Sequence, residues 1–480
     1  MFSKMAASMP MRQYLLCFAQ EHIEFRLAEL SAITSFFGIK AELNDTEYDH
    51  HNPFLLLRLP SESCAHKIMG RTMLGRFMIE VWGHGNSWSE LYESLNKVPE
   101  QNKAPYNLPE TSFCFKMRTL GKKLGMEEKL ATIEGLAECL DFKAKVDLRN
   151  PEHVFHVYAD YGLVPNQGPK EPYKVYFGRL ISEGQRQLEQ QYSIKKRHFI
   201  GNTSMDATLS LLMANQAKVK PGIVTFDPFV GTGSLLIAAA HFGSYVMGGD
   251  INANIIHGRG KTSRKGVPRY RGDDENIRAN LRQYGLEHLY LDVLVSDFSS
   301  QVWRERPLFD AIITDPPYGI RESTRKIGTA KSSEPSAESN TGPATETPTG
   351  TDEQSEQHIP AKTSYVLSDI FTDLLNFSAQ YLCLNGRLVF WLPVYRPEYT
   401  EAQVPHHPCL KLIANSEQPL SSYMGRRLIT MEKTKHIEDL EEDVAAEIQQ
   451  DCYQDHNSIR EKVIGLQFRI QRIKQTCSKT

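Results

Sequence analysis

The stretch 221–250 constrains the fold of this 480-residue chain more than any other. An apolar, β-branched run at 222–226 predicts a buried strand, and residues 235–241 predict the helix that follows it. The turn between them has the sequence DPFVGTGS, in which Gly231 and Gly233 allow a sharp turn and a close approach of the backbone to a ligand. A strand, a glycine turn and a helix in this order predict an α/β domain with a ligand at the turn.

Acidic residues follow the predicted strands of this region. Asp250 ends the next apolar run, seventeen residues after Gly233, so its carboxylate is placed to bind ribose hydroxyls. Because open α/β sheets bind ligands at the carboxyl ends of their strands, acids at these ends predict one shared site. The four acids are Asp227, Asp250, Asp297 and Asp315.

Asp315 opens a second motif, DPPY, directly after the apolar run 309–313. Proline has no N–H to donate and holds the preceding residue extended, so Pro316 and Pro317 lead the backbone out of the sheet along a stiff path. This path can gather a carboxylate, the carbonyl of Pro316 and the ring of Tyr318 around a planar base. Two oxygens that each accept an N–H from an exocyclic amine would free the lone pair of its nitrogen. A proline-rich surface turn is the alternative interpretation.

Later runs complete the predicted sheet. Residues 386–393 predict a fifth strand, and 410–414 with 427–432 predict an antiparallel hairpin that closes the sheet. Further elements are predicted as a strand at 290–296 and as helices at 207–217, 277–284 and 365–381.

Composition excludes several classes of protein. A formal net charge of −3 argues against a wholly basic nucleic-acid coat, so an RNA or DNA site must be a local patch. The eight cysteines show no Cys-x-x-Cys spacing, which fits free thiols in a reducing compartment, and we expect no metal site. No apolar run approaches the roughly 18 residues of a membrane span, and residues 1–13 lack a secretory apolar region. We therefore predict a cytosolic or nuclear protein, with the cytoplasm preferred.

Residues 13–190 alternate short β-like runs with amphipathic helices and show no catalytic constellation. One block ends near residue 100, and a second block shows the same alternation of strands and helices. This predicts two small α/β modules. Strands are predicted at 14–18, 54–59, 76–82, 112–118, 145–148, 154–159 and 173–180, and helices at 23–37, 61–69, from 87 onward and at 127–140.

The glycine turn and the DPPY motif together resemble those of the AdoMet-dependent amino methyltransferases. They differ from the Gly-x-Gly-x-x-Gly dinucleotide fingerprint, because Leu236 takes the place of the third glycine. Three longer stretches, at 195–206, 274–281 and 314–322, are similar to the eukaryotic tRNA guanosine-10 N2-methyltransferase catalytic subunits. This resemblance extends in chain order from about residue 14 to residue 433.

The resemblance implies an N-terminal ferredoxin-like module at 1–100, a THUMP-type RNA-binding module at 101–190 and a Rossmann-like class I methyltransferase domain at 191–432. A charged tail follows at 433–480. S-adenosyl-L-methionine is the implied cofactor, tRNA the implied substrate, and a small zinc-binding activator protein the implied obligate partner. Methyl transfer from a sulfonium is an in-line displacement, so we expect catalysis to depend mainly on positioning, without a metal.

The resemblance also divides the site residues into two sets. Asp297 ends the predicted strand 290–296, so its side chain is well placed to accept from the adenine amino group of the cofactor, and helix capping is the alternative. The catalytic set is Asp315, Pro316, Pro317 and Tyr318, and the cofactor-binding set is Asp227, Phe229, Gly231, Gly233, Asp250 and Asp297.

Four further segments are less specific. The basic run 195–199 predicts a solvated linker or a phosphate contact. Residues 257–271 hold six Lys or Arg and no acid, which predicts a mobile solvated insert or an RNA-phosphate contact. Residues 328–358, rich in Ser, Thr, Pro, Glu and Gly, are predicted to be disordered. The tail holds a possible helix with an apolar stripe between 459 and 473.

The resemblance favours methyl transfer to the N2 amine of a guanosine in tRNA, with the target base flipped out of its stack. The same chemistry on another base, such as adenine N6, stays open because the DPPY motif does not distinguish the two amines. A function of another class also stays open, namely an RNA-binding protein whose methyltransferase domain is catalytically silent.

Overall fold

The computed structural model describes residues 11–43, 48–164, 167–262, 270–318, 324–328 and 362–440. Several predicted features lie outside these residues: the centre of the basic insert at 263–269, residues 319–322 at the end of the stretch 314–322, the low-complexity insert from 329 onward, and the apolar stripe of the tail.

The chain divides into two compact units. The predicted limits of the two N-terminal modules, of the methyltransferase domain and of the tail remain predictions. Unit 1 comprises Met1–Lys196, Asp206–Lys218 and Ser416–Gln418, and unit 2 comprises Arg197–Met205, Val219–Asn415 and Pro419–Thr480.

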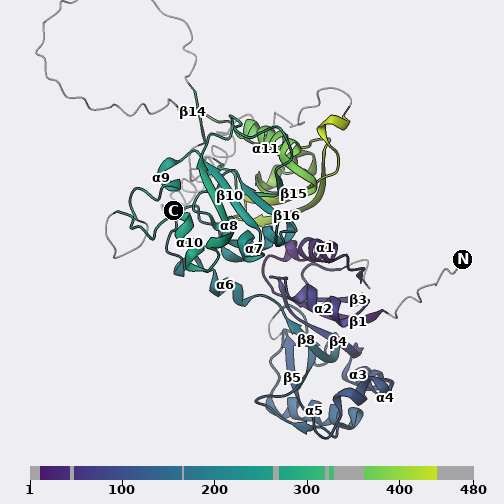
Figure 1. Ribbon diagram of the computed structural model, residues 1–480. Helices are drawn as coiled ribbons and strands as arrows, with labels where there is room; N and C mark the ends of the chain where they lie inside the picture. The colour runs from purple at the N-terminus through teal and green to yellow at the C-terminus, as the bar shows by residue number, and fades with distance from the viewer. Residues whose placement is uncertain are drawn as a thin grey trace, which may run out of the picture. The chain divides into compact units, whose positions relative to one another are not determined.

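Unit 1 contains one eight-stranded sheet with the strand order β2-β3-β1-β4-β8-β7-β5-β6 (Figure 1). Every strand predicted in this part of the chain is present. Strands β4 and β8 pair antiparallel with Glu80 opposite Arg179, so both predicted blocks contribute to a single continuous sheet. The strands are β1 (Arg12–Phe18), β2 (Glu42–Leu43), β3 (Phe54–Leu59), β4 (Gly75–Gly85), β5 (Ser112–Leu120), β6 (Lys145–Val146), β7 (His153–Asp160) and β8 (Lys174–Glu183).

The predicted helices of unit 1 are also present, and local capping explains where one of them begins. The hydroxyl of Ser87 accepts a hydrogen bond from Glu90 N at 3.2 Å, which starts α3 as the sequence predicted. Leu91 and Leu95 of α3 are fully buried in the core beneath the sheet. The helices are α1 (Arg26–Phe37), α2 (Glu62–Met69), α3 (Trp88–Asn96), α4 (Glu100–Lys103), α5 (Met126–Leu140), α6 (Gln187–Gln191) and α7 (Ala207–Gln216).

A buried carboxylate that the sequence analysis did not identify lies in the same unit. Glu29 on α1 is fully buried, and its carboxylate accepts hydrogen bonds from Met73 N at 2.7 Å and Leu74 N at 3.1 Å. The hydroxyl of Thr72 and the side-chain amide of Asn215 each donate to it at 2.8 Å. Because Asn215 belongs to α7, this network ties α7 to α1 and to the start of β4.

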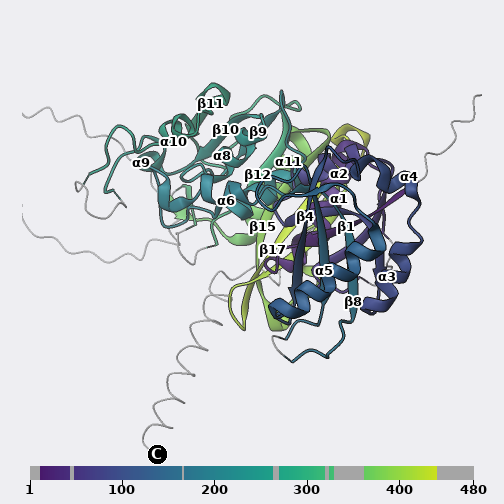
Figure 2. The same cartoon turned by 90° about the horizontal axis from the view of Figure 1, so that it is seen from below.

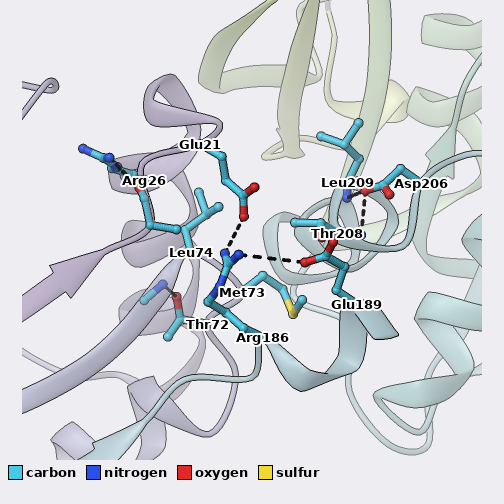
Figure 3. Close-up of polar contacts among 12 residues, drawn as sticks. Glu21, Arg26, Thr72, Met73, Leu74, Arg186, Glu189, Asp206, Thr208 and Leu209 are labelled. Atoms are coloured by element: carbon cyan, nitrogen blue, oxygen red, sulfur yellow. Dashed lines mark hydrogen bonds and ion pairs between the residues drawn. The ribbon is translucent and has the colours of Figure 1, made fainter. Parts of the chain in front are cut away.

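Figure 3 shows the polar contacts around the start of α7. Asp206 accepts hydrogen bonds from Thr208 N at 2.9 Å and from Leu209 N at 3.2 Å, so it caps the helix that the sequence predicts at 207–217. Nearby, the guanidinium of Arg186 forms ion pairs with Glu21 and Glu189.

Unit 2 contains a seven-stranded sheet with the order β11-β10-β9-β12-β15-β17-β16 (Figure 2). Strands β11 to β15 in this order run parallel, and β17 runs antiparallel to β15. The strand order reverses between β9 and β12, which is the arrangement of a Rossmann-like methyltransferase sheet, and the predicted fold class is confirmed. The strands are β9 (Val224–Asp227), β10 (Tyr245–Asp250), β11 (Tyr290–Val295), β12 (Phe309–Thr314), β15 (Leu382–Tyr395), β16 (Leu410–Pro419) and β17 (Met424–Lys433).

An aromatic core holds the two central strands of this sheet together. Phe226 of β9 stacks on Phe309 of β12 with the ring centroids 4.5 Å apart, and Phe377 of a covering helix packs against both. The parallel register, with Ile312 opposite Phe226, places the carboxyl ends of β9 and β12 side by side, where this fold class binds ligands. The helices of unit 2 are α8 (Ser234–His241), α9 (Ala253–Ile256), α10 (Ile277–Gln283) and α11 (Leu367–Tyr381).

A short hairpin, β13 (Arg325–Ile327) and β14 (Lys362–Ser364), lies in unit 2 beside the main sheet and was not predicted. Within the described parts of the chain, no helix has both the length and the apolar character needed to cross a bilayer.

Candidate active site

Asp227 lies at the carboxyl end of β9 and is 2% exposed. Its Oδ1 accepts a hydrogen bond from the hydroxyl of Thr314, at the end of β12, at 2.7 Å, and another from Phe229 N at 3.1 Å. Burial raises the pKa of Asp227 to about 7; the two hydrogen bonds oppose this rise, and the charges of Asp250 and Asp315 add to it. Three of the four predicted acids therefore share one electrostatic environment.

The glycine turn adopts the backbone conformation that its sequence predicts. Gly231 and Gly233 have φ angles of +48° and +78°, which lie in the left-handed region that favours glycine. A Cβ atom on Gly233 would lie 2.8 Å from Cγ2 of Ile277 at the start of α10, so the turn packs closely on this helix. At Gly231 an added Cβ would meet no atom within 4 Å, so the turn faces open space on its other side.

Asp250 ends β10 and is hydrogen-bonded to the glycine turn. Its Oδ2 accepts a hydrogen bond from Gly231 N at 3.0 Å, and its Oδ1 accepts one from Asn252 N at 2.8 Å. The carboxylate therefore lies directly against the turn that the sequence places seventeen residues before it. Its ribose-binding role remains a prediction.

Asp297 lies just after β11, at 9% exposure. Its Oδ1 accepts hydrogen bonds from the backbone N and the hydroxyl of Ser299 at 2.9 and 2.8 Å, so it closes a turn and begins no helix. The alternative prediction, that Asp297 caps a helix, is therefore wrong. Ile327 N, at the end of β13, donates to the other oxygen of Asp297, which places the end of this strand next to the acid.

The DPPY motif leaves the sheet where it was predicted to do so. Strand β12 ends at Thr314, and residues 315–318 have no regular secondary structure. Asp315 is half-buried and Pro316 is buried. The hydroxyl of Tyr318 is buried and has no hydrogen-bond partner among the described residues.

Sequence reasoning did not identify Arg426 as part of this site. Nη1 of Arg426, on β17, lies 3.2 Å from Oδ2 of Asp315. The same guanidinium lies over the ring of Trp391 on β15, 3.9 Å from its centroid. Nothing local in the sequence marks Arg426, because its partner is 111 positions earlier in the chain.

The basic run at 195–199 has a structural role that neither predicted alternative described. Arg197 is buried, and its Nη1 donates a hydrogen bond to the hydroxyl of Ser234, the first residue of α8, at 2.7 Å. Phe199 is also buried and exchanges two backbone-to-amide hydrogen bonds of 2.8 Å with Asn280 of α10. This segment therefore contacts both α10 and the start of α8, which directly follows the glycine turn, while Lys195 and Lys196 are exposed.

The described ends of the basic insert are also held by the protein. The guanidinium of Arg271 lies over the ring of Phe199, 4.7 Å from its centroid, and donates to the carbonyl of Arg259 at 2.9 Å. The side chain of Arg271 is therefore held by contacts within the protein.

Comparison with known proteins supports the predicted THUMP-type region in the N-terminal part of the chain and the predicted methyltransferase region that follows it. A family model described as the Tmrp11 THUMP N-terminal domain matches residues 12–186, and one described as an RMKL-like methyltransferase domain matches residues 195–330.

Full-length relatives are similar over nearly the whole chain. The chicken tRNA (guanine(10)-N(2))-methyltransferase TRMT11 is 52% identical over 458 residues, covering 95% of this chain and 96% of the relative. The human protein of the same name is 52% identical over 464 residues, covering 95% and 96%. The Saccharomyces cerevisiae tRNA (guanine(10)-N(2))-methyltransferase is 34% identical over 435 residues, covering 87% and 93%. The resemblance drawn from the motifs is confirmed, and the chain belongs to the tRNA (guanine(10)-N(2))-methyltransferase family.

Proposed function

We propose that this chain transfers a methyl group from S-adenosyl-L-methionine to the N2 amine of a guanosine in tRNA, at position 10 by family membership. The observation that carries the proposal is the adjacency of the two motifs. The ion-paired Asp315 of the DPPY motif directly follows Thr314, whose hydroxyl is bonded to Asp227 of the glycine turn. A methyl donor at the turn would therefore lie next to an amine at the DPPY motif.

The residues at the glycine turn fit the cofactor. Gly231 borders open space that a side chain at this position would fill, and the backbone there is positioned for a close ligand. Asp250 and Asp297 supply carboxylate acceptors at the ends of β10 and β11 for ribose hydroxyls and an adenine amine. When bound, the cofactor supplies an electrophilic methyl group on a sulfonium. Asp227, Phe229 and Gly233 complete the proposed cofactor-binding set.

The DPPY motif would bind and orient the substrate amine. Asp315 and the carbonyl of Pro316 would each accept one N–H, drawing the nitrogen toward tetrahedral geometry and directing its lone pair at the methyl group. Pro317 keeps the path of the chain stiff, and Tyr318 would stack on the flipped base. The proton of the product amine can leave to water after transfer, so Asp315 need not act as a strong base.

Three finer statements rest on the family resemblance. We propose that unit 1 delivers the tRNA through its THUMP-type module, that a small zinc-binding activator protein is the partner subunit, and that the enzyme works in the cytoplasm. RNA would be held mainly through backbone and shape.

The test uses the full chain, bulk tRNA and methyl-labelled S-adenosyl-L-methionine, with and without the activator, followed by nucleoside analysis. N2-methylguanosine that appears with the activator would support the proposal. Label on adenosine, or on DNA, would overturn the substrate. No transfer despite bound cofactor would favour a catalytically silent RNA-binding protein. The matched variant Asp315→Ala should abolish transfer and leave cofactor affinity within about twofold, because Asp315 lies on the substrate side; loss of both would assign it a structural role.

A further inference from the structure

We propose that Arg426 is a positioning residue that keeps Asp315 ionised and correctly oriented for the substrate amine. The proposal rests on the proposed function, because it takes Asp315 as the acceptor of an amine N–H. It adds a residue outside both sequence motifs to the machinery of methyl transfer.

The geometry of the sheet brings Arg426 to Asp315 from two strands away. Thr314 of β12 pairs with Phe390 of β15, so Asp315 and Trp391 lie at the next level along the sheet. Strand β15 separates β12 from β17, a distance of about 10 Å across the sheet. Only a long side chain on β17 can span β15, and the 3.2 Å contact between Nη1 of Arg426 and Oδ2 of Asp315 shows that this one does.

Trp391 provides the surface over which Arg426 reaches. The direct partner of Trp391 on β17 is Leu428, so Arg426, two residues away, is its diagonal neighbour on the same face. Trp391 is fully buried, and its ring centroid is 3.9 Å from the guanidinium carbon. The flat guanidinium therefore contacts an aromatic face and a carboxylate at the same time, an arrangement that a lysine ammonium cannot reproduce.

The surrounding charges explain why a cation is needed here. Asp315 interacts unfavourably with Asp227 on β9, which is itself close to Asp250 on β10. The charges of Asp250 and Asp315 both disfavour the ionised form of Asp227, so negative charge is concentrated at these strand ends. Arg426 approaches from the opposite side, on β17, and favours the ionised form of Asp315. Its own side chain is 15% exposed and that of Asp315 is 25% exposed, so solvent screens the pair only partly.

The charge state matters because only an ionised carboxylate is purely an acceptor. A protonated Asp315 would present an O–H donor to an amine that must itself donate. The ion pair uses a contact to Oδ2, and a carboxylate has about four lone-pair sites, so this contact takes up only part of the acceptor capacity of Asp315. Arg426 therefore sets the orientation of the carboxylate without replacing its function.

The test compares Arg426→Gln with wild type in single-turnover methyl transfer to tRNA between pH 5.5 and 9, using the full chain with its activator. We expect the rate at pH 7.5 to fall roughly 10- to 100-fold, because the acceptor is no longer held in place. We also expect the acidic limb of the pH–rate profile to move upward by about one pH unit or more, because a neighbouring cation has been removed. Cofactor affinity, measured by calorimetry, should change by less than about twofold, because Arg426 does not touch the glycine turn.

Arg427 is the matched control. It is the adjacent arginine on β17, its guanidinium lies 4.4 Å from the ring centroid of Tyr399, and it donates to Asn415. Arg427→Gln should leave the acidic limb where it is in wild type. If Arg426→Gln fails to fold, Arg426→Lys serves instead: it should keep the position of the acidic limb and lose rate, because it retains charge without the planar fork.

The outcomes separate this inference from the proposed function. A lower rate for Arg426→Gln with an unmoved acidic limb would overturn the positioning role and leave a structural one. A normal rate for Arg426→Gln, alongside an inactive Asp315→Ala, would overturn this inference alone. Full activity of Asp315→Ala would overturn the proposed function itself.

Discussion

The hydroxyl of Thr314 donates a hydrogen bond of 2.7 Å to the buried carboxylate of Asp227. The two residues end neighbouring parallel strands, β12 and β9, at the point where the strand order reverses. One residue later the chain enters the DPPY motif, and directly after Asp227 it enters the glycine turn. This single bond therefore joins the proposed substrate side of the site to its cofactor side.

Replacing Thr314 with valine should weaken this junction. The variant keeps the shape of the side chain and leaves Asp227 with one fewer donor, so we expect a loss of about 1–3 kcal/mol in the free energy of unfolding. Urea denaturation at pH 7.5 measures it. Thr225→Val is the control, because it removes a buried hydroxyl contact with Ser244 elsewhere in the sheet. Only Thr314→Val should also weaken cofactor binding; equal binding losses in both variants would contradict the assignment.

The stability of the protein should depend on pH through Asp227. Because burial raises its pKa in the folded state from 3.8 to about 7, the folded protein binds this proton more tightly than the unfolded chain does. The stabilising contribution is therefore complete below pH 3.8 and is lost as the pH rises through about 7. Asp227→Asn should remove this dependence, so the difference in unfolding free energy between wild type and variant should become less favourable to wild type from pH 4 to pH 8. A constant difference would contradict the raised pKa.

The two glycines of the turn should respond differently to alanine. Gly233→Ala adds a Cβ 2.8 Å from Ile277 at a φ of +78°, so it should lower both stability and cofactor affinity. Gly231→Ala adds a Cβ into open space at a φ of +48°, so its cost in stability should be limited to the backbone term of about 1–2 kcal/mol. Thermal melting and calorimetry with S-adenosyl-L-methionine measure the two effects. If Gly231→Ala binds the cofactor as wild type does, the space beside Gly231 is not the cofactor site.

Glu29 should contribute strongly to the stability of unit 1. Burial raises the pKa of its carboxyl group, and four donors surround it, so Glu29→Ala leaves several buried donors without an acceptor. We expect a loss of about 3 kcal/mol or more, and a smaller loss for Glu29→Gln, which keeps one acceptor oxygen. Glu24→Gln, at an exposed position of the same segment, should change stability by less than about 0.5 kcal/mol. Equal urea midpoints for Glu29→Ala and Glu24→Gln would contradict the role of the network.

Local signals in the sequence were sufficient for most of the strands and longer helices and for the two motifs. The strands that end at Asp227, Asp250 and Thr314 were predicted from short apolar runs, because a buried strand must be apolar on both faces. The turn was predicted because positive φ angles require glycine, and Gly231 and Gly233 have them. The acids at the strand ends could be grouped because parallel strands present their carboxyl ends at one edge.

The tertiary structure alone decided the contacts that join distant parts of the chain. It placed Arg426 on Asp315 across 111 positions and Asn215 on Glu29 across 186 positions, and it merged two predicted blocks into one sheet. It also buried Arg197, which composition alone presented as one member of an exposed basic run. Periodicity reports which face of an element is apolar, but the partner of a polar side chain depends on strand order and register. These are properties of the assembled sheet, so no local pattern in the sequence contains them.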